Sequence, residues 1–342
     1  MDNQDYGNPP QPVVPPVQII EKKQKRSIWG ILRTIIMGFS MIINVVLFLM
    51  LIGLGMFIFT GQKDVLQEEI VRDGPAGTKI AVVNLQGTIY AEQAENVYKQ
   101  LRSAQKDDQV KAVILRVDSP GGTVSASDEI HHEIMNFRTI TKKPVIAFMQ
   151  GTAASGGYYA SVACEKIIAE PTTITGSIGV ISSYMVLKNL LEDKLGVQPV
   201  VIKSGAKKDW PSSFRDPNEE EIRYIHDKLI KPTLEIFVNV VAKGREKVLT
   251  LNEVRELADG SIFGAQEAMD KKLIDDIGYL DDAIKMVKSM AGIGDAQIIQ
   301  YKRPFSLGSI LGVESKQNLL KLDKNTLFEL GTPQTLYLWN AY

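Results

Sequence analysis

Residues 151–159, GTAASGGYY, form a turn of small side chains between two apolar runs. The run at 144–149 has a strand-like pattern, and the run at 158–164 has a helix-like one. Small residues let other atoms approach the backbone, and Ser155 brings a hydroxyl to the start of the helix, beside its unpaired N–H groups. This stretch alone indicates either a presented nucleophile or, more readily, a serine that caps a buried helix.

Strand and helix patterns alternate on both sides of this turn. We expect strands at residues 79–85, 110–117, 144–149, 166–169, 178–181, 197–202 and 297–301. We expect helices at residues 94–104, 130–137, 158–164, 185–195, 218–241, 251–257, 265–271 and 280–290, with a kink or break at Pro232. The alternation predicts an α/β fold with a mostly parallel sheet and flanking helices.

Two glycine-rich turns follow strand patterns, DSPGG at 118–122 and the turn at 150–157. The carboxyl ends of parallel strands share one edge of a sheet, where catalytic groups collect. There the backbone N–H of Gly121 or Gly122, and that of Gly156, suit the oxyanion of an acyl-transfer intermediate. An ordinary tight turn at 119–122 is the alternative.

A nucleophilic serine needs a base, and histidine is the usual one. Two of the three histidines, His131 and His132, lie about two helical turns beyond Gly122, which favours packing or surface roles for them. The third is His226. None of the three is placed by the sequence where it would serve Ser155.

Lysine is the other choice of base, because burial disfavours its charged form and lowers its pKa. The loop KSGAKKDWP at 203–211 follows a predicted strand and holds Lys203, Lys207 and Lys208. A solvated surface charge is the ordinary fate of any lysine. The residues themselves do not choose among the three.

Residues 34–60 contain no charged side chain, and as a helix they would be about 40 Å long. The run is too long for a signal-peptide core, and no small-residue cleavage site follows it, so it predicts an uncleaved transmembrane helix. Lysines and arginines between residues 22 and 33 place residues 1–33 in the cytoplasm and everything after residue 60 across the membrane. The net charge of −1 gives no reason to expect nucleic acid as a partner.

Several motifs in order make the sequence recognisable. They are DSPGG at 118–122, AASGGYY at 153–159, TGSIGV at 175–180, KSGAKKD at 203–209, DGSIFGAQEA at 259–268 and LIDDIG at 273–278. In their order and spacing, residues 79–290 resemble the signal peptide peptidase A family in its short form. The resemblance implies a membrane-anchored serine endopeptidase with a Ser/Lys dyad on a ClpP/crotonase-like α/β fold.

The family pattern can be carried over to individual residues. Ser155 matches the nucleophile, and Lys208 matches the general base in a Gly-x-x-Lys-Asp pattern. The spacing from Ser155 to this loop departs from the family by one residue, which leaves Lys207 as the alternative. Ser177 matches a serine that orients the lysine. The resemblance also makes Gly122 the oxyanion-hole glycine, with the amide of Gly156 beside it.

The same resemblance implies an organisation and partners. Together with the Pro-rich composition near the start of the chain and the uncharged run, which lie outside residues 79–290, it divides the chain into a disordered Pro-rich cytoplasmic tail (1–33), a transmembrane helix (34–60), a linker (61–77), the peptidase domain (78–300) and a C-terminal tail (301–342). It implies a bacterial membrane location, a homo-oligomer whose active sites are shared between protomers, and no cofactor or metal. The substrates would be remnant signal peptides and similar apolar peptides.

Three further hypotheses remain at this point. The apolar run LYLW at 336–339 resembles a substrate, so it either plugs the active site or is simply a docked tail. An acyl-CoA hydratase or isomerase of the crotonase type would share the oxyanion hole, but it belongs in the cytosol. A non-catalytic membrane scaffold would not require Ser155, Ser177 and Lys208.

Overall fold

The computed structural model describes residues 27–60, 66–302 and 334–339. The chain divides into two compact units, Met1–Gly61 and Gln62–Tyr342. Most of the tail expected at 1–33 and much of the tail expected at 301–342 lie outside the described residues.

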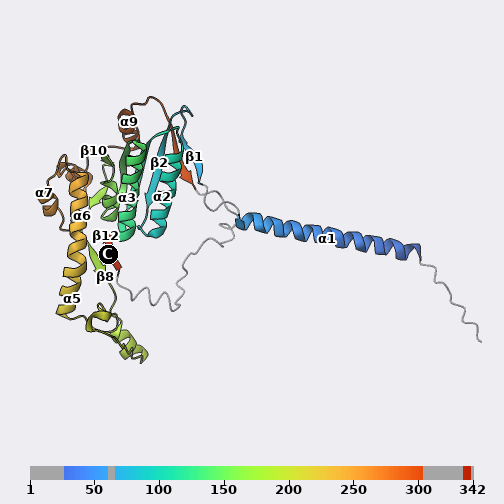
Figure 1. Ribbon diagram of the computed structural model, residues 1–342, viewed down its shortest axis with the longest axis horizontal. Coiled ribbons are helices and arrows are strands. Elements are labelled where there is room, and N and C mark those ends of the chain that lie inside the picture. Colours follow the sequence, from blue (N-terminus) through green and yellow to red (C-terminus); the bar gives the residue numbers. More distant parts are fainter. Residues whose placement is uncertain (1–26, 61–65, 303–333, 340–342) are drawn as a thin grey trace, which may run out of the picture. The chain divides into compact units, whose positions relative to one another are not determined.

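The first unit contains one described helix, α1 Ile28–Thr60 (Figure 1). Residues Ile28–Gly53 are long and apolar enough to cross a membrane, and the apolar window within them is not buried. The helix begins earlier than the uncharged run at 34–60 and includes Arg33. The reason is that a helical backbone tolerates a terminal charge, whereas a hydropathy pattern ends at it.

The second unit is built on a sheet that has nine strands among the described residues (Figure 1). The order along its main path is β1-β11-β2-β3-β5-β6-β10, and β7 and β9 continue from β5. The strands are β1 Gln67–Arg72, β2 Lys79–Gln86, β3 Val110–Ser119, β5 Val145–Ala154, β6 Lys166–Ala169, β7 Ile174–Gly176, β9 Ile262–Gly264, β10 Asp276–Ile277 and β11 Gln297–Lys302. From β11 to β10 all neighbours are parallel, as the alternating pattern predicts.

Helices cover both faces of this sheet, because alternate residues of its strands point to opposite sides. On β2, Val83 and Leu85 belong to one hydrophobic core, and Ile80 and Val82 belong to another. The first core includes residues of α2 Ala91–Lys106, α3 Val124–Thr141, α4 Gly156–Ser161, α6 Lys231–Gly244, α7 Leu251–Glu256 and α8 Ala265–Asp270. The second is closed by α9 Leu280–Ala291.

A small antiparallel sheet lies at the carboxyl end of β3. It consists of β4 Gly121–Thr123, β12 Gln334–Leu338 and β8 Ile181–Ser183, with β12 in the middle. Residues Gln334–Leu338 are therefore part of the folded body, and β12 lies against the DSPGG turn.

The folded body extends beyond the boundaries expected at 78 and 300. Strand β1 lies within the expected linker and pairs with β11, which continues to Lys302. The sequence QEEIVR of β1 is charged and mostly exposed, so it lacks the apolar alternation typical of a strand. Its partner strand, not its own pattern, makes it a strand.

The structure differs most from expectation between residues 181 and 211, where no residue is buried. The strand expected at 197–202 is absent, and the helix expected at 185–195 is reduced to a short helical stretch around the π-turn η1 Leu190–Lys194. The apolar side chains there find no covering layer among the described residues, so their pattern does not produce regular structure.

The long helix expected at 218–241 is interrupted. It consists of α5 Glu219–Ile225, the π-turn η3 His226–Ile230 and α6 Lys231–Gly244. Pro232 lies in the first turn of α6, where its missing N–H costs no helical hydrogen bond. The irregular turn therefore falls just before the proline.

Candidate active site

Ser155 lies between β5 and α4 in a strained backbone conformation, with φ 54° and ψ −114°. A positive φ costs a non-glycine residue about 1–3 kcal/mol, which the surrounding structure must offset. The side chain of Ser155 makes no capping hydrogen bond to α4, and the residue is only 1% exposed. The structure thus contradicts the helix-cap interpretation of this serine.

Two glycine turns meet beside Ser155. Gly121 has φ 99°, and a Cβ atom built on it would lie 2.7 Å from the backbone N of Gly156. A Cβ atom on Gly122 would lie 2.0 Å from the carbonyl oxygen of Ile89. Only glycine fits such close backbone approaches. The convergence expected at the strand ends is therefore observed.

Ser177, which directly follows β7, lies close to the Ser155 turn. The N–H of Ser155 donates a hydrogen bond of 2.8 Å to the carbonyl of Gly176, next to Ser177. Ser177 also has a positive φ, 49°, and its own N–H donates to Ser261 O at 2.7 Å. Ser155, Ser177 and the glycine turns thus form one assembly of backbone at the carboxyl edge of the sheet.

Strand β12 lies directly over the glycine turns. Tyr337 is the partner of Gly122 in the antiparallel ladder, and Leu338 is the partner of Gly121. The carbonyl oxygen of Tyr337 lies 2.1 Å from a Cβ built on Gly121 and 3.1 Å from one built on Gly156. Strand β12 therefore covers both glycine turns beside Ser155.

The side chain of Tyr337 fills an aromatic pocket that the sequence did not reveal. Its ring stacks on Tyr159 at 5.1 Å and contacts Phe237 at 4.6 Å, and its hydroxyl donates to Thr233 O at 3.0 Å. The hydroxyl of Tyr159 is 2.6 Å from Asp128 Oδ1. Tyr159 and Phe237 fit ordinary core patterns, so only their juxtaposition identifies the pocket.

Among the described residues, the histidines form no hydrogen bond with Ser155 or Ser177. His131 contacts the Tyr159 ring edge-on at 5.4 Å, and burial lowers its pKa from 6.5 to about 4. His226 is exposed and lies 3.0 Å from the carboxylate of Asp227. Neither histidine has a hydrogen bond to Ser155 in the described part of the chain.

The three lysines of the 203–211 loop differ in their contacts. Lys203 Nζ lies 2.6 Å from Asp209 Oδ1. Lys207 Nζ lies 4.4 Å from the centre of the Tyr224 ring and 5.0 Å from that of Trp210. Lys208 lies in the 3₁₀ turn η2 Ala206–Asp209, and its backbone N–H donates to Gly205 O at 3.1 Å, but its side-chain amine has no ion pair, hydrogen bond or ring contact with the described residues. Its amine alone among the three is uncommitted within the described residues.

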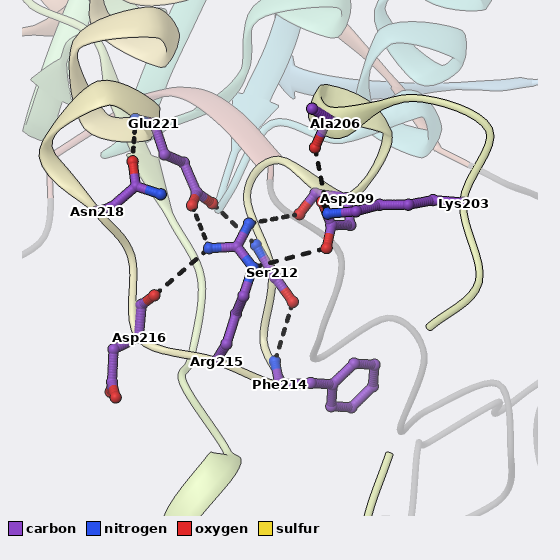
Figure 2. A network of polar contacts seen from close by, with 9 residues as sticks. All are labelled: Lys203, Ala206, Asp209, Ser212, Phe214, Arg215, Asp216, Asn218 and Glu221. Atoms are coloured by element: carbon purple, nitrogen blue, oxygen red, sulfur yellow. Dashed lines mark hydrogen bonds and ion pairs between the residues drawn. The ribbon is translucent and has the colours of Figure 1, made fainter. Parts of the chain in front are cut away.

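A network of charges holds this loop (Figure 2). Arg215 Nη1 donates to the carboxylate of Glu221, and Arg215 Nε lies 3.6 Å from Asp209 Oδ2. Figure 2 shows Arg215 between these two carboxylates, with Lys203 on the far side of Asp209. Yet no hydrogen bond or ion pair among the described residues joins Lys208 to Ser155 or Ser177.

Comparison with known proteins identifies relatives. The model of peptidase family S49 matches residues 138–294, and that of Clp protease matches residues 77–174. The chain is 39% identical over 256 residues to an Enterococcus faecium protein with the name signal peptide peptidase SppA, covering 72% of this chain and 73% of that protein. It is 35% identical over 219 residues to Protease 4 of Haemophilus influenzae, covering 62% of this chain and 35% of that protein. It is also 34% identical over 200 residues to the chloroplastic serine protease SPPA of Arabidopsis thaliana, covering 58% and 29%.

Proposed function

The chain belongs to peptidase family S49 and is a serine protease, and within that activity we propose that Ser155 is the nucleophile and Lys208 the general base. The relatives confirm the resemblance seen in the sequence and do not support an acyl-CoA enzyme or a non-catalytic scaffold. The observation that carries the proposal is the strained, buried turn of Ser155 against the two glycine turns.

The proposed mechanism begins with Lys208 in its neutral form. Its amine takes the proton of Ser155 Oγ, and the oxygen attacks the scissile carbonyl carbon. The amides of Gly122 and Gly156 hold the resulting oxyanion, and Lys208 then protonates the leaving amine. Water hydrolyses the acyl-enzyme with Lys208 as base. Ser177 orients the amine of Lys208 through its hydroxyl.

The free amine of Lys208 supports its selection over the other two lysines. Lys203 is engaged by a carboxylate, and Lys207 lies against two aromatic rings with Glu220 Oε1 at 3.7 Å. Each of these partners favours a charged amine, whereas a general base must lose its proton.

We also propose that the base acts on a neighbouring copy, in a homo-oligomer with shared active sites. Within the described residues the segment 181–211 has no buried residue, and Val200 and Ile202 are 83% and 95% exposed. An exposed apolar surface of this kind marks an interaction site. Contact of this segment with a second copy would cover it and carry Lys208, which lies within it, to the partner's serine.

The proposed substrates are remnant signal peptides and similar apolar peptides, bound in extended form along β4 as β12 is. The exposed apolar helix α1 supports an anchor in a bacterial membrane, with residues 1–33 cytoplasmic and the peptidase domain on the other side. Because β12 covers the same strand, the C-terminus would act as a plug that substrates displace.

The test uses the full chain in detergent. Covalent labelling by a fluorophosphonate and hydrolysis of a short apolar peptide are measured for wild type, Ser155→Ala, Lys208→Ala and the control Lys207→Ala. We expect Ser155→Ala to abolish labelling, Lys208→Ala to slow it by about 10²–10⁴-fold, and Lys207→Ala to slow it far less than Lys208→Ala. Labelling that survives in Ser155→Ala, or full activity in Lys208→Ala, would refute the assignment.

A further inference from the structure

We propose that Glu221 and Arg215 are positioning residues for the proteolytic reaction, because their ion pair, in which the Glu221 carboxylate is buried, fixes the turn that carries Lys208 (Figure 2). The proposal rests on the assignment of Lys208 as the general base. Among the described residues neither has a hydrogen bond or ion pair with Ser155, so both would act through the position of the lysine backbone.

Glu221 is an unusual residue for the first turn of a helix, because it is only 1% exposed. Its Oε1 accepts a hydrogen bond of 3.2 Å from the N–H of Ser212, and its Oε2 accepts one from Arg215. Its own N–H donates to Asn218 Oδ1 at 2.8 Å, which caps α5. A buried carboxylate without such partners would be strongly destabilising, so Glu221 constrains the positions of Ser212 and Arg215.

Arg215 passes this constraint to the turn of Lys208. Its Nη2 donates to the backbone oxygen of Asp209 at 3.4 Å, and its Nε lies 3.6 Å from Asp209 Oδ2. Hydrogen bonding to Glu221 raises the pKa of Arg215, and contact with Lys203, then Arg215, lowers the pKa of Asp209. These groups therefore remain charged, and Asp209 directly follows Lys208 in the chain.

The residue on the other side of Lys208 is tied to the same helix. The amine of Lys207 lies 4.4 Å from the ring centre of Tyr224, which belongs to α5 like Glu221. Both sequence neighbours of Lys208 are thus anchored, whereas its own side chain is free among the described residues. This arrangement fixes the backbone of the base and leaves its amine available, as proton transfer requires.

The experiment compares two adjacent carboxylates. Glu221→Gln keeps the size of the buried side chain and removes its charge, and Glu220→Gln is the matched control, since its side chain is 73% exposed. We expect Glu221→Gln to lower kcat and the labelling rate about tenfold with KM within about twofold, and Glu220→Gln to change each by less than about twofold. Equal rates for the two variants would overturn the proposal.

A double-mutant cycle separates positioning from general loss of structure. In a Lys208→Ala background, Glu221→Gln should cause no further loss, because its effect passes through the missing amine. A loss of the same size in both backgrounds would mean a merely structural role and would overturn the proposal. Arg215→Lys keeps the positive charge but removes the forked guanidinium group. It should lower activity in the wild-type background and cause no further loss in the Lys208→Ala background. If Glu221→Gln does not fold, Arg215→Lys provides the test.

The base assignment and the positioning role fail in different ways. Full activity of Lys208→Ala would refute the base and, with it, the premise of this role. An inactive Lys208→Ala together with wild-type rates for Glu221→Gln and Arg215→Lys would refute the positioning role alone.

Discussion

The turn that carries Ser155 and the turn that carries Lys208 are built in opposite ways. Ser155 is buried, and backbone contacts with Gly176 and the glycine turns hold it in place. Lys208 lies in a segment without buried residues between 181 and 211, and ion pairs between side chains hold that segment. In the proposed dyad, the sheet therefore fixes the position of Ser155. The position of Lys208 depends on ion pairs and on the contact that covers its loop.

The largest expected effect is on the serine side, at Gly121. In Gly121→Ala the new methyl group would meet Tyr337 O at 2.1 Å and Gly156 N at 2.7 Å, at a φ of 99° that disfavours any side chain. We expect kcat/KM to fall by about 10²–10³-fold, the size of effect typical of a lost oxyanion donor.

The matched control for this change is Gly87→Ala. Gly87 also has a positive φ, 73°, but no atom lies within 4 Å of its added Cβ. It should lose about 1 kcal/mol of stability and keep its activity. If both variants lost activity equally, backbone strain rather than crowding at the site would explain the effect.

The second effect is on the lysine side, at the exposed Ile202. We expect Ile202→Asp to reduce activity about 10²-fold and to dissociate the proposed oligomer, because a charge would be buried against the second copy. Size-exclusion chromatography with multi-angle light scattering and peptide hydrolysis measure the two effects.

Mixing then gives the direction of this contact. Ser155→Ala and Lys208→Ala chains, each inactive, should regain activity at about one quarter of the sites when combined. Ile202→Asp should prevent this recovery when placed in the chain that supplies the lysine, but not when placed in the chain that supplies the serine. The same result in both placements would argue against the hypothesis that Ile202 and Lys208 of one chain contact the neighbouring chain together.

A smaller effect is expected from removing β12. A chain that ends at residue 333 lacks the strand that pairs with Gly121 and Gly122, so its groove is open to peptides. We expect hydrolysis of a short peptide to become about three- to tenfold faster, mainly through a lower KM. An unchanged KM would show that β12 is an integral strand that substrates do not replace.

The smallest effect on activity concerns His131, a partly buried residue of α3 that contacts Tyr159. The folded state holds its pKa near 4, whereas an unfolded histidine titrates near 6.5. The unfolded chain therefore binds a proton first, so this stabilisation is complete above about pH 6.5 and is lost as the pH falls to about 4. We expect the free energy of unfolding to fall by about 2–3 kcal/mol over this range. Thermal melts at several pH values measure this loss.

His131→Phe should remove this pH dependence and leave the peptidase rate at pH 7 unchanged, because the ring contact with Tyr159 needs no proton. His226→Gln, at an exposed position, is the control and should keep the wild-type slope. A peptidase rate that fell with His131→Phe would assign this histidine a role in catalysis.

Local patterns were sufficient for much of the fold. The buried runs that became β2, β3 and β5 and the glycine turns after β3 and β5 were predictable, because strand periodicity and the steric demands of glycine are properties of neighbouring residues. The parallel order followed from the alternation of strands with helices. The convergence of Ser155 with Gly122 and Gly156 was predictable for the same reason.

Strand identity in the less apolar segments depended on partners far away in the chain. The charged sequence of β1 became a strand only because β11 lies beside it, and β12 only because β4 and β8 flank it. Conversely, the apolar residues at 197–202 read as a strand, but they find no partner among the described residues of one chain. Pairing across long sequence separations is invisible to a local pattern.

The sequence by itself determined the α/β fold, the family motifs and the serine that one would choose as nucleophile. Only the tertiary structure decided how the lysines differ, since Asp209 engages Lys203 and the rings of Tyr224 and Trp210 engage Lys207. It alone also formed the aromatic pocket around Tyr337. The physical reason is that main-chain turns are specified by adjacent residues, whereas charges and rings acquire their roles from whichever groups the fold brings within a few ångströms.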